Sequence, residues 1–164
     1  MLWSKHRRFA LLRNLFLGGA LLAPFPVAFA ALTVTETTSP TLGVLLTGAS
    51  GRNFILNTDE TVSGTAAADY LSGAVTGRLS VKKTGGSQSA TIVADNFSWT
   101  GNVSFSVVPC KFDTGSQTTC EGSGITVTLN ATKTLYVGVD LNTTAAHTGG
   151  QTASATYDIT VTLI

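Results

Sequence analysis

The chain has 164 residues, and its 10 basic and 9 acidic residues give a formal net charge of +1. Four of the basic residues lie within the first 30 positions, so residues 31–164 hold six basic and nine acidic groups. A body with this balance lacks the positive surface that binds nucleic acid or an anionic membrane. Its length of ~130 residues fits one domain around one core.

Residues 1–30 have the three parts of a secretory signal peptide. Lys5 to Arg13 form a positive region, Leu15 to Leu22 are apolar, and Ala28 and Ala30 form a small-x-small cleavage site. The alternative is a retained membrane anchor, but the apolar stretch is too short to span ~30 Å of hydrocarbon. We therefore predict export by the general secretory route to the periplasm, cell surface or medium, with no membrane segment left after processing.

Residues 31–164 are rich in Thr, Val, Ser and Gly, a composition that favours strands over helices. Apolar and polar residues alternate in five segments, over 74–83, 103–108, 125–129, 133–141 and 153–163. One-sided strands of this kind form antiparallel sheets, and two such sheets that face each other form a sandwich. We predict an all-β domain over 31–164, a single antiparallel β-sandwich of immunoglobulin-like or pilin-like type with about nine strands.

Two of these segments lead to specific expectations. In 133–141, the residues Leu135, Val137, Val139 and Leu141 are expected to share one face of a single strand. In 103–108, a strand is expected to run directly into Cys110. A short helical turn is predicted over 65–71, where alanines cluster.

Cys110 and Cys120 are the only cysteines, with nine residues between them. In an oxidising compartment an even number of cysteines indicates a disulfide. The spacing does not match a redox C-x-x-C motif, and no histidine accompanies the pair as a zinc site would require. We predict a structural disulfide at the base of a hairpin loop.

Candidate catalytic chemistry is sparse in residues 31–164, and we predict no catalytic residue, no cofactor and no metal. His147 is the one histidine of the body and lies in a Gly-rich stretch without a nucleophile elbow. Acidic residues are scattered apart from Asp59 and Glu60, which leaves open only a calcium site assembled from separate loops. Trp99 is a candidate for stacking on a sugar, but its spacing from Phe97 favours packing in the core.

Short motifs in the chain resemble a family of secreted bacterial proteins, the domain of unknown function numbered forty-four-oh-two. The motifs are Leu135 to Gly138, the turn at Gly149 and Gly150, the segment Tyr157 to Thr162, and a first mature strand that reads LTVTET. The chain has Leu42-Gly43 where the family prefers Phe-Gly. The layout is more distantly similar to chaperone–usher pilin subunits and the spore-coat-U group. This resemblance implies a bacterial surface protein and carries over no catalytic residue.

Three functions follow as hypotheses from these features. The first is a non-enzymatic, exported structural or adhesive subunit, pilin-like, whose partners are copies of itself and a periplasmic chaperone or assembly system. The second is a monomeric extracellular module that binds a glycan or small ligand, and the third is an enzyme. Under the first hypothesis the strand 31–38 is donated to a neighbour through Leu32 and Val34, although Glu36 falls on the same face. The alternative is that this strand belongs to its own domain.

Overall fold

The computed structural model describes residues 31–45, 48–146 and 154–164. The prediction of an all-β chain is confirmed, because these residues form antiparallel sheets without any α-helix among them. The helical turn predicted over 65–71 is present as the 3-10 turn η1 (Ala67–Asp69). The strands number fourteen in the described part of the chain, against about nine expected, and six of the fourteen have only two to four residues. The fourteen strands are β1 (Leu32–Thr38), β2 (Val44–Leu45), β3 (Asn53–Leu56), β4 (Val62–Ser63), β5 (Tyr70–Ser72), β6 (Gly77–Lys83), β7 (Gln88–Thr100), β8 (Val103–Val107), β9 (Pro109–Phe112), β10 (Thr118–Thr119), β11 (Ile125–Leu129), β12 (Thr132–Val137), β13 (Val139–Thr143) and β14 (Ser154–Leu163).

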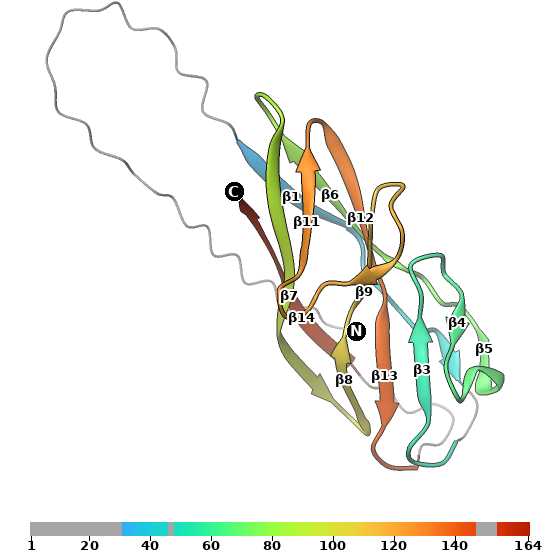
Figure 1. The fold of residues 1–164 in the computed structure, drawn as a ribbon. Coiled ribbons are helices and arrows are strands. Elements are labelled where there is room, and N and C mark those ends of the chain that lie inside the picture. Colours follow the sequence, from blue (N-terminus) through green and yellow to red (C-terminus); the bar gives the residue numbers. More distant parts are fainter. Residues whose placement is uncertain (1–30, 46–47, 147–153) are drawn as a thin grey trace, which may run out of the picture.

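These strands form four sheets in the described part of the chain. A five-stranded sheet has the order β1-β6-β12-β9-β10, and a three-stranded sheet has the order β11-β7-β14. A four-stranded sheet, β4-β3-β13-β8, and the pair β2-β5 complete the fold. Figure 1 shows β1, β6, β11 and β12 toward one end of the molecule and β3, β8 and β13 toward the other.

The five-stranded and three-stranded sheets share one hydrophobic core. Val81 of β6 and Leu135 of β12 are fully buried in the same cluster as Ile92 of β7, Leu129 of β11 and the nearly buried Tyr157 of β14. Each fully buried aliphatic side chain contributes about 1.5–3 kcal/mol relative to exposure. The period-two alternation therefore places one apolar face of each sheet on this core.

The expectation of one continuous strand over 133–141 is wrong. The chain forms β12 in the five-stranded sheet and β13 in the four-stranded sheet, and Gly138 separates them. The backbone of Gly138 is packed tightly, since an added Cβ would lie 1.9 Å from the Leu56 carbonyl oxygen. Its N–H donates to the Pro109 carbonyl at 2.7 Å. Close packing of three backbones is the reason the chain changes sheets here.

The expected strand over 103–108 divides in a similar way. β8 ends at Val107 in the four-stranded sheet, and β9 begins at Pro109 in the five-stranded sheet. Cys110 therefore belongs to β9 rather than to the end of β8. The chain thus changes sheets between β8 and β9, and again between β12 and β13. Because β9 pairs with β12 and β8 pairs with β13, the two changes between the four-stranded and five-stranded sheets lie side by side.

Candidate functional site

The first strand, which the sequence marks as a candidate for assembly, lies in the sheet of its own chain. β1 pairs antiparallel with β6, from Leu32 opposite Lys83 to Thr38 opposite Arg78. Leu32 and Val34 are partly buried and pack against the core. β1 is an edge strand, with β6 as its one sheet neighbour among the described residues.

The end of β1 is irregular. The register with β6 shifts between Glu36 and Thr38, which marks a bulge of the kind common at sheet edges. Glu36 faces the same side as Val34, and the Ser39 hydroxyl donates to its Oε1 atom at 2.5 Å. Pro40 follows and is buried. The apolar face of β1 is thus short, as the sequence predicts.

The predicted disulfide is confirmed, with the Sγ atoms of Cys110 and Cys120 1.99 Å apart. Both residues are fully buried. β10 pairs with β9, with Thr118 opposite Cys110. The disulfide therefore closes the base of the β9–β10 hairpin, as expected.

The loop of the same hairpin is tied to the β3–β4 connection by Gln117. Its Oε1 atom accepts from the backbone N–H and the hydroxyl of Thr58, both at 2.8 Å. Its Nε2 atom donates to Oδ1 of Asn57 at 3.0 Å. The hairpin is therefore held by a covalent bond at its base and by three hydrogen bonds of Gln117, the last residue of its loop.

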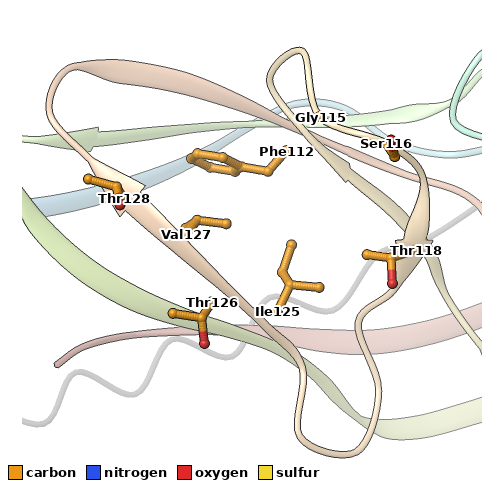
Figure 2. Close-up of a pocket in the computed structure, with 8 residues that line it drawn as sticks. All are labelled: Phe112, Gly115, Ser116, Thr118, Ile125, Thr126, Val127 and Thr128. Atoms are coloured by element: carbon orange, nitrogen blue, oxygen red, sulfur yellow. The ribbon is translucent and has the colours of Figure 1, made fainter.

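An open groove of about 460 Å³ lies between this hairpin and β11 (Figure 2). We call it the edge groove. Its floor has three partly buried apolar side chains, those of Phe112, Ile125 and Val127. Figure 2 shows them pointing into the space between the hairpin and β11. None of the eight lining residues is charged: Phe112, Gly115, Ser116, Thr118, Ile125, Thr126, Val127 and Thr128.

Sequence reasoning missed the edge groove. The alternation of Ile125, Val127 and Leu129 was visible, but nothing local indicated that Ile125 and Val127 would be only partly covered. Phe112 comes from a different sheet and reaches the groove only because β9 crosses into the five-stranded sheet.

The expectation that Trp99 packs in the core is wrong, since it is 45% exposed. Phe97 does pack against the core, and its ring centroid lies 5.2 Å from the ring centroid of Phe105. Trp99 lies two residues closer to the end of β7. Its ring contacts that of Phe105 edge to face, with the two ring centroids 5.9 Å apart. The core ends near Phe97, so the next side chain on that face is left half in solvent.

The acidic pair Asp59 and Glu60 does not act as a unit. The hydroxyl and backbone N–H of Thr61 donate to Asp59 and lower the pKa of its carboxyl below the ordinary value. Glu60 instead forms an ion pair with Arg78, with Oε1 of Glu60 2.8 Å from a guanidinium nitrogen of Arg78. Among the residues that the structure describes, no group of three or more His, Cys, Asp or Glu side chains is placed to hold a metal ion.

Several predicted sites lie outside the described residues, namely Ala28 and Ala30 of the cleavage site and His147. Within the described ranges, no helix is long and apolar enough to cross a membrane. Comparisons with family models, curated proteins and solved structures find no match. The resemblance drawn from the short motifs therefore stays a prediction.

Proposed function

We propose that this chain is a non-enzymatic, exported structural or adhesive subunit of a bacterial surface, and that it assembles by exchanging β1 between copies. In this proposal its two core-sharing sheets form a sandwich of immunoglobulin-like or pilin-like type. The observation that carries the proposal is the position of β1, an edge strand at the start of the described chain with β6 as its neighbour.

Exchange of an edge strand between identical subunits costs little free energy. A donated β1 would make with the β6 of a neighbouring subunit the same antiparallel pairs that it makes within its own chain, from Leu32–Lys83 to Thr38–Arg78. The bulge after Glu36 and the Ser39-Pro40 step supply a hinge. A head-to-tail exchange does not close, so it produces filaments. A periplasmic chaperone would cover the β6 edge before assembly.

A cross-link between register partners tests the exchange. Thr33 and Lys82 face each other on the exposed side of β1 and β6, so the double variant Thr33→Cys and Lys82→Cys places two thiols together without disturbing the core. In exported protein we expect a ladder of disulfide-linked multimers on a non-reducing gel. Cross-linked monomer alone would show that β1 stays in its own chain.

A matched control uses partners that the proposal leaves within one chain. Thr91 of β7 and Thr162 of β14 are opposite each other, and the double variant Thr91→Cys and Thr162→Cys should give a cross-linked monomer only. A ladder from this control as well would mean that thiols on neighbouring molecules react without strand exchange.

The exposure of Trp99 favours a second candidate function, a glycan-binding module. A half-exposed indole held by an edge contact with Phe105 presents a face on which a sugar ring can stack. Trp99 is the one tryptophan in residues 31–164, so its fluorescence reports binding directly. Titration of the processed protein with a panel of soluble glycans should change that emission, and Trp99→Ala should abolish the affinity measured by isothermal titration calorimetry, which needs no fluorophore. An unchanged emission across the panel would remove this candidate.

A further inference from the structure

The edge groove has the features of an unfilled strand position. β11 pairs with β7 along one side, in five consecutive partners from Ile125–Ile92 to Leu129–Gln88. It is an edge of the three-stranded sheet, and β7 is its one sheet partner among the described residues. The backbone groups along its other side therefore face the groove rather than a neighbouring strand.

At the same edge of the three-stranded sheet, the strand position that is open beside β11 is filled a few residues away, at the level of Cys120. Cys120 lies beside β7, since the Ala94 N–H donates to its carbonyl at 2.7 Å. On its other side, the Cys120 N–H donates to the Val108 carbonyl at 3.1 Å. Val108 thus takes the next strand position at the level of Cys120, whereas the corresponding position at the level of 125–128 is the groove.

The edge of β11 also lacks the usual protection against strand addition. Sheet edges are commonly blocked by a bulge, a charge or a proline. β1 has a register shift beside Glu36, and β14 has one beside Asp158. β11 is uncharged, contains no proline and pairs with β7 in regular register.

We infer that the edge groove binds an extended, uncharged strand of a partner protein beside β11. Such a strand would bond to the open backbone edge and place aliphatic side chains, at every second position, against Phe112, Ile125 and Val127. A charged strand is disfavoured because none of the lining residues is charged to pair with it.

A second copy of this chain fits the groove less well. Its β1 is already paired with β6, and insertion would carry Glu36 toward the apolar floor. Its β11 is part of a folded sheet, and the β9–β10 hairpin stands across the groove from the open edge of β11 (Figure 2). The disulfide and the bonds of Gln117 hold that hairpin in place. A single extended strand enters such a groove, whereas the edge of a folded domain meets the hairpin.

The test uses the processed, disulfide-bonded chain and a synthetic peptide with the core VTVTV, flanked by Gly-Lys at both ends for solubility. Backbone amide shifts in NMR spectra should change at residues 112–118 and 125–128. A control peptide with the core VTDTV should bind much more weakly. Because β1 lies at the far edge of the five-stranded sheet, binding here is independent of strand exchange.

Two tryptophan variants separate the groove from the rest of the surface. Ser116 is an exposed residue of the hairpin that lines the groove, and Ser116→Trp fills the space without altering the core. It should weaken peptide binding by about tenfold or more, equivalent to about 1.4 kcal/mol. Ser87→Trp, at an exposed turn between β6 and β7, should leave the affinity unchanged.

Three outcomes would overturn the inference. One is the absence of shift changes at 112–118 and 125–128 in millimolar peptide. Another is peptide affinity that folded Ser116→Trp protein retains in full. The last is concentration-dependent dimerisation of the processed chain that Ser116→Trp abolishes, which would assign the groove to a second copy.

Discussion

Gly138 shows how one residue controls where a strand ends. Its Cβ position is filled by the Leu56 carbonyl oxygen at 1.9 Å and the Pro109 side chain at 3.2 Å. The nearest of these atoms belongs to a strand backbone, so it cannot move aside cheaply. A side chain at this position has no space, whatever its polarity.

Gly138→Ala should therefore lower the free energy of unfolding by about 3 kcal/mol, the upper part of the usual range for overpacking. Gly86→Ala is the matched control, since no atom lies within 4 Å of its Cβ position, and it should change stability by no more than about 0.5 kcal/mol. Urea unfolding of both variants measures the difference. Equal stabilities would mean that the backbone at Gly138 relaxes freely.

Tyr157 is a buried phenol, 6% exposed, with its ring 6.0 Å from Phe105 and 6.3 Å from Phe97. Burial, and to a smaller extent the charge of Glu36, raises the pKa of Tyr157 above its ordinary value of 10.0. The native state thus favours the neutral phenol. Below pH 10 both states are protonated and this residue contributes no pH dependence.

Above pH 10 the unfolded chain releases the Tyr157 proton and the native state keeps it, so stability should fall as pH rises. The limiting slope for one group is about 1.36 kcal/mol per pH unit. Tyr157→Phe removes this contribution, and its unfolding free energy should fall less steeply between about pH 10 and 11. Guanidinium unfolding of both proteins across this range provides the comparison. Parallel pH profiles would contradict the assignment.

At the scale of elements, the β9–β10 hairpin depends on both covalent and hydrogen bonds. The disulfide closes a short loop, and Gln117 ties that loop to the β3–β4 connection. The hairpin forms one wall of the edge groove. Its rigidity therefore affects stability and the shape of the groove together.

Replacement of Cys110 and Cys120 by Ser should lower stability by roughly 2–3 kcal/mol, because the reduced chain regains the entropy of an open loop of about ten residues. The fold should persist, since the core extends across the five-stranded and three-stranded sheets. Chemical denaturation measures the loss, and alkylation before reduction tests the bond in exported protein. Two thiols that alkylate freely in native protein would contradict the disulfide.

At the scale of the whole molecule, the first described residue is already anchored. The Ala31 N–H donates to the Thr84 hydroxyl at 3.1 Å, and the Thr84 N–H donates to the Ala31 carbonyl at 3.0 Å. β1 begins at the next residue, Leu32. A chain that begins at Ala31 would therefore retain every contact of β1.

Signal peptidase is expected to cut after Ala30, so the exported chain should begin Ala31-Leu32-Thr33. Intact mass spectrometry of exported protein should give the mass of residues 31–164 with one disulfide. The same measurement after reduction should add the mass of two hydrogens. An exported species that retains residues 1–30 would show that this segment is an anchor rather than a signal.

The strand class and the disulfide could both be predicted from the amino-acid sequence, because both follow from local information. Alternation of apolar and polar residues has the period of a strand wherever it occurs, as in 125–129, which matches β11 residue for residue. Two cysteines allow one pairing. The spacing of Leu32, Val34 and Glu36 by two residues also predicts that Glu36 lies on the apolar side of β1, as it does.

The points where strands change sheets, and the apolar residues that stay exposed, could not be predicted in this way, because they depend on contacts made in the folded chain. Alternation continues through 133–141, but the Leu56 and Pro109 backbones, distant in sequence, divide that segment at Gly138. Trp99 and Phe97 have the same spacing pattern as core residues, yet the core ends between them. The edge groove forms because Phe112 and Val127, on different sheets, meet beside an unpaired edge. Burial depends on contacts between distant segments, and a local pattern does not contain them.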